Sequence, residues 1–165
     1  MISVRPARPE DVPALAEIGL AAWRKGIGPL VSADIAARIE TSNPFVPFLE
    51  DRGPGVLVGE RDGTLAGFGA SEDADTHISD LWVSPMHEGC GVARAIVSAL
   101  EKTLLQAGHT HASISVAVGN DRALALYLHL GYLEVWRGSR HDPALDTILE
   151  QVDLEKSLVK GSRAP

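Results

Sequence analysis

Residues 78–105 constrain the fold most, because a predicted strand, a glycine-rich turn and a helix follow one another without interruption. Ile78–Val83 is a short apolar run with β-branched and aromatic residues, and Ser84-Pro85 ends it because proline cannot donate to a sheet ladder. The turn, Glu88–Ala93, contains two glycines and leads directly into the helix. Apolar residues recur in that helix at every fourth position, as Val92, Ile96, Leu100 and Leu104. Gly108 stands where a helix often ends.

A strand, a glycine turn and a helix N-terminus together favour the binding of an anion. The first helical turn has unpaired backbone N–H groups, and the helix dipole adds about half a positive charge there. Glycines let a phosphate approach those donors. A P-loop would need Lys-Ser or Lys-Thr after its last glycine, whereas Val92-Ala93 stands here, and Arg94 breaks the G-x-G-x-x-G dinucleotide pattern. A turn without any ligand remains the alternative.

The run LWVSPMHEGCGVARAIVSALE resembles motif A of the GCN5-related N-acetyltransferases (GNAT), where L-x-V-x-P precedes Q/R-x-x-G-x-G/A and a helix. One position departs from this pattern, since Glu88 replaces the usual Gln or Arg. In the family that position mainly offers its backbone to the pyrophosphate of coenzyme A, so the change is tolerable. An acidic side chain there would still weaken binding unless it points outward. A second segment, Asn120–Tyr132, is similar to the family signature N-x-x-A-x-x-L-Y-x-x-x-G-F/Y.

The remaining chain alternates strands and helices in the order that this resemblance implies. We expect strands at 2–5, 56–60, 65–71, 77–83, 112–118, 133–137 and 148–154, helices at 12–23, 33–39, 92–107 and 120–130, a loop at 43–55 and an acidic turn at 72–75. The expected fold is a mixed α/β GNAT fold, not a doubly wound sheet. It has a central sheet of about seven strands and about four helices, with two helices after the first strand. One domain would span 1–155, followed by a polar tail at 156–165.

Composition narrows the class of protein. An apolar content of 45% is enough for a core, and no apolar run approaches the roughly 20 residues that span a bilayer. The N-terminus lacks a signal-peptide core, and the single cysteine, Cys90, is typical of a reducing compartment, so we expect a cytoplasmic protein. A net charge of −7 disfavours nucleic acid and favours a cationic partner such as an amine. The six histidines have no metal-ligand spacing, so no metal is expected, and a homodimer stays open.

Acyl transfer to an amine requires three kinds of group. The amine must be neutral although its pKa is about 10.4, the developing oxyanion needs a donor, and the departing thiolate benefits from a proton. The resemblance assigns the second task to the backbone N–H of Val83 and the third to Tyr127. Asn120 and Tyr127 are seven residues apart, so two helical turns place both on one groove. N-capping alone for Asn120, and core packing alone for Tyr127, are the alternatives.

The resemblance implies acetyl-CoA as co-substrate and a set of residues that contact it. This set comprises Leu81, Trp82, Val83, Glu88, Gly89, Cys90, Gly91, Val92, Ala93, Arg94, Asn120 and Tyr127. We expect the acceptor pocket to be formed by the first two helices and the last hairpin, with Trp23, Phe45, Trp136 and His141 as candidates.

The sequence constrains the identity of the general base less than that of the other site residues. Spermidine-type family members have Glu-Asp where this chain has Ser79-Asp80, so Asp80 matches the acid and Ser79 does not. In the acetyltransferases of ribosomal protein N-termini, a glutamate stands at the position of Ser115. Asp80 and His77, acting through water, are therefore the candidates, and a hydrogen bond to nearby backbone is the alternative for Asp80.

These observations favour an N-acetyltransferase that passes acetyl directly from acetyl-CoA to a small primary amine. Direct transfer is expected because no activated nucleophile is visible. A peptide N-terminus is the alternative acceptor. A non-catalytic acyl-CoA sensor is an alternative from another class, which Tyr127 disfavours because a binder needs no acid for a thiolate.

Overall fold

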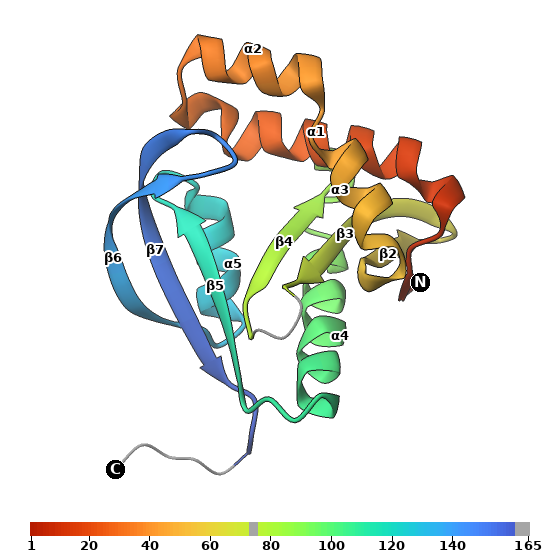
Figure 1. Ribbon diagram of the computed structural model, residues 1–165. Coiled ribbons are helices and arrows are strands. Elements are labelled where there is room, and N and C mark those ends of the chain that lie inside the picture. The colour runs from red at the N-terminus through yellow and green to blue at the C-terminus, as the bar shows by residue number, and fades with distance from the viewer. Residues whose placement is uncertain (73–75, 161–165) are drawn as a thin grey trace.

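The computed structural model describes residues 1–72 and 76–160 and arranges them as two β-sheets with helices on both faces (Figure 1). The first sheet has the order β1-β2-β3-β4 and the second the order β5-β7-β6, with antiparallel neighbours throughout. The strands are β1 (Ile2–Pro6), β2 (Leu57–Arg61), β3 (Thr64–Ser71), β4 (Ile78–Val83), β5 (His111–Ala117), β6 (Leu133–Asp142) and β7 (Thr147–Ser157). The predicted mixed α/β fold and its order of strands are confirmed.

Five α-helices and four short 3-10 turns lie in the described part of the chain. The helices are α1 (Val12–Gly26), α2 (Ala33–Ser42), α3 (Phe45–Arg52), α4 (Val92–Gln106) and α5 (Asp121–His129). The 3-10 turns are η1 (Pro9–Asp11), η2 (Gly28–Leu30), η3 (Gly53–Gly55) and η4 (Pro85–His87). None of these helices is long and apolar enough to cross a membrane.

Helix α3 replaces part of the loop that was expected over 43–55, and that expectation was wrong for residues 45–52. Phe45 and Leu49 are four residues apart and both are buried, so one helical face packs on the core. Pro47 is tolerated because it falls in the first turn, where its missing N–H would be unpaired anyway. The Phe45 ring stacks edge-on against Trp82 with centroids 5.1 Å apart, which fixes α3 against β4.

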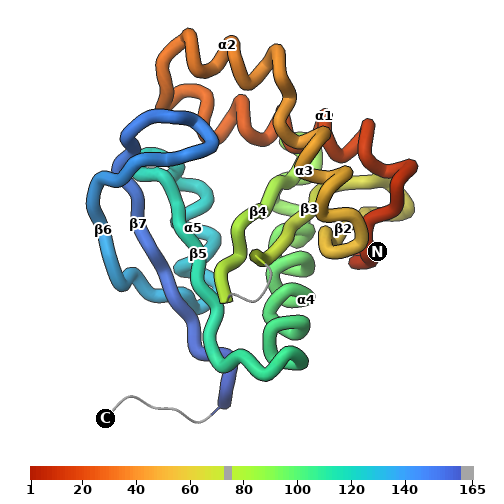
Figure 2. The backbone as a smooth tube through the Cα atoms, in the orientation of Figure 1, coloured from red at the N-terminus to blue at the C-terminus, as the bar shows by residue number. Residues whose placement is uncertain are grey.

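The expected central sheet is divided between β4 and β5, and this division shapes the molecule. The two strands are joined by one parallel bridge, between His77 and Ser113, where the Ser113 N–H also donates to the Thr76 carbonyl at 3.0 Å. Beyond that bridge they diverge, as Figure 2 shows, and α1 runs across the wider end. Because neighbouring strands separate, the carboxyl ends of β4 and β5 are free to line a cavity.

The last hairpin is longer than predicted, with β6 continuing to Asp142 and β7 to Ser157. The polar tail was expected to begin at residue 156, and this was wrong for residues 156 and 157, which belong to β7. Residues 161–165 of the expected tail lie outside the described residues. The acidic turn expected at 72–75 likewise falls mostly on residues 73–75, outside the described part.

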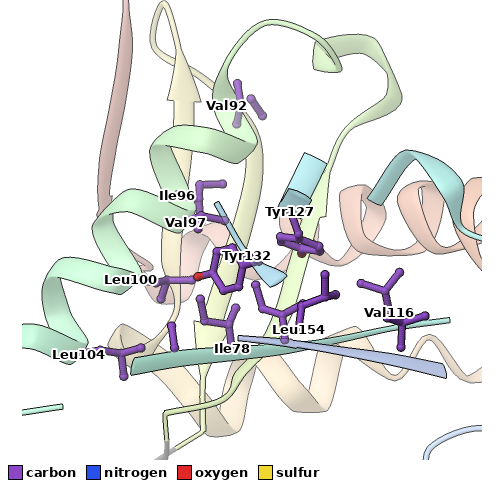
Figure 3. Close-up of a cluster of buried hydrophobic side chains, with 14 residues drawn as sticks. Ile78, Val92, Ile96, Val97, Leu100, Leu104, Val116, Tyr127, Tyr132 and Leu154 are labelled. Carbon is purple, nitrogen blue, oxygen red and sulfur yellow. The ribbon is translucent and has the colours of Figure 1, made fainter. Parts of the chain in front are cut away.

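Two hydrophobic clusters hold the helices to the sheets. The first joins α4 and α5 to both sheets and includes Ile96, Leu100, Tyr127, Tyr132 and Leu154 (Figure 3). The second packs α1, α2 and α3 on the other side of β2 and β3.

Helix α4 approaches the first sheet closely because two strand positions lack side chains. A Cβ at Gly59 would lie 2.9 Å from the Ile96 Cδ1 atom, and a Cβ at Gly69 would lie 2.8 Å from the Ile96 Cγ2 atom. The close contact seats α4 so that its N-terminus lies beside the divergence of β4 and β5.

Candidate active site

A cavity of about 810 Å³ lies at the carboxyl end of β4, between the N-terminal turns of α4 and α5. Its walls come from four parts of the chain that are distant in sequence. They are the end of α1 (Ala22, Lys25, Gly26), the end of β4 (Leu81, Trp82, Val83), the glycine turn with the start of α4 (His87, Glu88, Gly89, Gly91, Val92, Ala93, Arg94), and the segment into α5 (Gly119, Asn120, Asp121, Arg122, Ala123, Leu126, Tyr127, His129). The predicted strand, turn and helix are thus brought together with the predicted Asn120–Tyr127 pair.

The glycine turn presents backbone donors to this cavity. Gly89 and Gly91 have φ angles of +71° and +88°, which other residues rarely adopt, and Gly91 is the N-cap of α4. In the described structure no side chain caps this end of the helix, so its first N–H groups remain available. The turn therefore has the local geometry of an anion site. Cys90 differs from its neighbours, since its Sγ atom lies 2.7 Å from the Arg61 Nη1 atom and it is not one of the residues that line the cavity.

Glu88 does not point outward into solvent. An outward orientation was the condition under which its acidic side chain would not weaken cofactor binding. Its carboxylate lies 2.5 Å from the Lys25 Nζ atom of α1 and 2.8 Å from the Arg122 Nη1 atom of α5. The glutamate side chain is only 18% exposed. The acidic charge beside the glycine turn is therefore balanced by two cations that also line the cavity.

Tyr127 lies at the inner wall of the cavity and is 6% exposed. Its ring packs edge-on against Tyr132, with centroids 5.9 Å apart, and the Tyr132 hydroxyl donates to Glu101 at 2.9 Å. Burial raises the pKa of the Tyr127 hydroxyl, and the negative charge of Asp80 raises it further. Tyr127 therefore keeps its proton through the neutral and mildly alkaline range and can act as a donor.

Asn120 caps its helix and also lines the cavity. Its Oδ1 atom accepts a 3.4 Å hydrogen bond from the Ala123 N–H and so caps α5, and the same residue lines the cavity. A Cβ at Gly26 would lie 3.3 Å from the Asn120 Nδ2 atom, so the end of α1 sits directly against this side chain.

The two candidate bases are placed differently from each other. Asp80 accepts a hydrogen bond from the Trp82 indole at 3.0 Å and acts electrostatically on Tyr127, although it does not line the described cavity. His77 stands before the first residue of β4, with its Nδ1 atom 3.0 Å from the Ser113 hydroxyl. His77 is not among the residues that line the cavity, and it precedes Val83 by six positions, roughly 20 Å of extended chain.

The four residues suggested for the acceptor pocket do not converge. Trp23 and Phe45 are 5% and 6% exposed and belong to the core under α1 and α3. Trp136 lies under the Arg140 guanidinium at 4.4 Å, and His141 pairs with Asp146 at 2.9 Å, both on the last hairpin. None of the four lines the cavity as described.

Sequence reasoning missed several residues of the cavity wall, and Lys25, Arg122 and His87 are the ones that bear on its chemistry. Lys25 and Arg122 reach Glu88 as described above, and the His87 Nδ1 atom is buried without a hydrogen-bond partner among the described residues. Arg122 stands inside the segment 120–132 that resembles the family signature, and that signal could have pointed to it. Lys25 carries no comparable local signal. Separately, no group of three or more His, Cys, Asp or Glu in the described chain is arranged to hold a metal ion.

Comparison with known proteins supports the resemblance seen in the sequence. A family model described as "Acetyltransferase (GNAT) family" matches residues 30–132. No curated protein matches the chain.

Among solved structures, a GCN5-related N-acetyltransferase from Rhodopseudomonas palustris superposes with a TM-score of 0.76 at 23% identity, covering 94% of each chain. PaiA N-acetyltransferase from Thermoplasma acidophilum, in complex with coenzyme A, has a TM-score of 0.71 at 15% identity over 95% of this chain and 99% of that one. YncA from Salmonella typhimurium, with its cofactor acetyl-CoA, has a TM-score of 0.68 at 19% identity over 100% and 98%. At these identities the likeness confirms the fold.

Proposed function

We propose, from the premise that the chain belongs to the acetyltransferase (GNAT) family, that it transfers an acetyl group from acetyl-CoA to the primary amine of a small molecule. The observation that carries this proposal is that the uncapped N-terminus of α4 and the buried Tyr127 line the same cavity. The first feature suits the phosphates of a nucleotide cofactor, and the second suits the sulfur of its thioester.

The cofactor would lie along the cavity from the glycine turn to the end of β4. Backbone N–H groups of Gly91, Val92 and Ala93 would hold the diphosphate of the cofactor. The rest of the cofactor, with its thioester, would extend past Leu81–Val83 toward Tyr127. The backbone N–H of Val83 is the candidate donor to the carbonyl oxygen as negative charge develops there. PaiA and YncA, which share the fold, are proteins that bind coenzyme A or acetyl-CoA.

Tyr127 would stabilise the departing thiolate. Because burial and Asp80 raise the pKa of its hydroxyl, Tyr127 is protonated when the amine attacks. A free thiol has a pKa of about 8.5, so the thiolate is the weaker base of the two and complete proton transfer to it is not required. Donation of a hydrogen bond from the Tyr127 hydroxyl during departure is sufficient, because it strengthens as charge develops on sulfur.

The amine would be deprotonated on the Asp80 side of the divergence between β4 and β5. The Asp80 carboxylate carries a negative charge that acts on the buried Tyr127 hydroxyl, and we propose it as the group that accepts the amine proton through water. His77 stays the second candidate for the general base. Because its imidazole lies beside Ser113, it would need a longer chain of water molecules to reach the amine. The net charge of −7 further favours a cationic acceptor. We also propose a cytoplasmic location, in keeping with the unpaired Cys90 thiol.

The test is an assay of thiol release from acetyl-CoA across polyamines, aminoglycosides, amino acids and short peptides, with acetylated products identified by mass spectrometry. We expect one class of small amine to be turned over at 1 s⁻¹ or faster, on the order of an ordinary enzyme. Preference for a peptide N-terminus would replace the proposed acceptor class while leaving the transferase intact. Absence of any acetylated product across the panel, with coenzyme A still bound, would favour the sensor.

A further inference from the structure

We infer that the Glu88 carboxylate competes with the cofactor's phosphates for the cations Lys25 and Arg122. The carboxylate pairs with both cations until a phosphate displaces it. The inference rests on the proposed use of acetyl-CoA and adds to it a residue that sets cofactor affinity. It would make this glutamate a determinant of binding through its side chain, in addition to any contact from its backbone.

Three separate elements meet at this carboxylate. Glu88 is the first residue of the glycine turn, Lys25 lies in the last turn of α1, and Arg122 lies in the first turn of α5. The two ion pairs measure 2.5 and 2.8 Å. All three residues line the cavity that also contains the start of α4. The carboxylate therefore bridges two walls of the cavity beside the backbone donors for an anion.

The exposures of the three side chains indicate which of them can move. Glu88 is 18% exposed, whereas Lys25 and Arg122 are 52% and 62% exposed. Long exposed cations can reorient at little cost, because exposed ion pairs contribute little net stability. A diphosphate offers more negative charge and more acceptor oxygens than one carboxylate, so both cations can exchange to it.

The competition follows from charge. A carboxylate next to the first turn of α4 repels an incoming phosphate and also occupies the two cations that would attract it. Neutral glutamine at this position would remove the repulsion and leave both cations unpaired. The effect should appear for donors that carry phosphates and vanish for donors that carry none.

The experiment compares the wild-type chain with Glu88→Gln by titration calorimetry with coenzyme A at low and moderate salt. We expect the Kd for coenzyme A to fall about three- to tenfold, as the loss of two weakly coupled pairs allows. The gain should shrink as salt increases, because screening weakens all of these charges. Glu134→Gln, which removes an exposed ion pair with Arg137 on β6, is the control and should leave the Kd unchanged.

Two further arms separate this inference from a general change in the site. With S-acetylpantetheine, a donor without phosphates, Glu88→Gln should show no gain in kcat/KM over the wild type. The double variant Glu88→Gln/Arg122→Gln should lose most of the gain in affinity for coenzyme A. An unchanged or raised Kd in Glu88→Gln overturns the competition, and so does an equal gain with S-acetylpantetheine. Failure of the wild type to bind coenzyme A at all would overturn the proposed use of acetyl-CoA as well.

Discussion

Burial raises the pKa of the Tyr127 hydroxyl, on α5, and the carboxylate of Asp80, on β4, raises it further. The two side chains have different surroundings in the core. Tyr127 is buried with the cluster around α4, whereas Asp80 hydrogen-bonds Trp82, which packs toward α1 and α3. We propose that the cofactor binds on the Tyr127 side and that the amine approaches from the Asp80 side.

Tyr127→Phe tests the role of the hydroxyl, since the change removes one O–H group and little volume. We expect kcat and kcat/KM with acetyl-CoA to fall together by about 10²–10⁴-fold, because the interaction develops in the transition state. The Kd for coenzyme A and the melting temperature should hardly change. Steady-state kinetics with calorimetry would check this, and a Phe variant with wild-type turnover would show that Tyr127 only packs in the core.

Asp80→Asn separates the charge of Asp80 from its hydrogen bond, because the amide oxygen can still accept from the Trp82 indole. If Asp80 helps to deprotonate the amine, kcat/KM for the acceptor should fall about 10- to 100-fold near pH 7. The loss should diminish as the pH rises toward the amine pKa of about 10.4, where the acceptor is neutral without help. A pH profile of both proteins measures this, and a loss that is constant from pH 7 to 10 would assign Asp80 a positioning role instead.

Asp11 should make the fold sensitive to acid. Its buried carboxylate accepts from the Arg5 guanidinium at 2.7 and 3.0 Å, and this hydrogen bonding holds the pKa of Asp11 below its ordinary value. A group with a lowered folded-state pKa stabilises the fold above its unfolded pKa, about 3.9, and the contribution is lost as the pH falls through the lower folded value.

We therefore expect Asp11→Asn to lower the free energy of unfolding by about 2 kcal/mol at pH 7, with a smaller difference near pH 3. Urea denaturation at the two pH values provides the measurement. Asp51→Asn, at an exposed position, serves as the control and should stay within about 0.5 kcal/mol of the wild type. Equal destabilisation of Asp11→Asn at both pH values would contradict the linkage.

The parts of the site that could be predicted from sequence are those built by local geometry. The strand, the glycine turn and α4 follow one another directly, and the seven-residue spacing of Asn120 and Tyr127 is a property of any helix. The strand–turn–helix unit and the Asn120–Tyr127 pair therefore occur in the structure near the positions that the sequence patterns predicted.

The parts that could not be predicted depend on distant contacts. Lys25 meets Glu88 across 63 positions, a pairing with no sequence signal. Helix α3 exists because Phe45 packs on Trp82 and Phe68, which lie far along the chain and override the proline-rich composition of that segment. The placement of His77 away from the cavity depends on where β4 and β5 stop pairing, which is set by the single bridge to Ser113.

Melting curves with coenzyme A test the central claim most directly, namely that the cavity at the glycine turn is the cofactor site. At a ligand concentration of 100 times Kd, linkage gives about 2.7 kcal/mol of stabilisation, which for a chain of this size raises Tm by roughly 5–10 °C. Coenzyme A and acetyl-CoA should both produce this shift in the wild type, and NAD and ATP should produce much less. Gly91→Val should abolish it, whereas Gly63→Val, which also replaces a glycine of positive φ but in the β2–β3 turn, should retain it. A wild-type Tm that does not respond to millimolar coenzyme A would contradict the account.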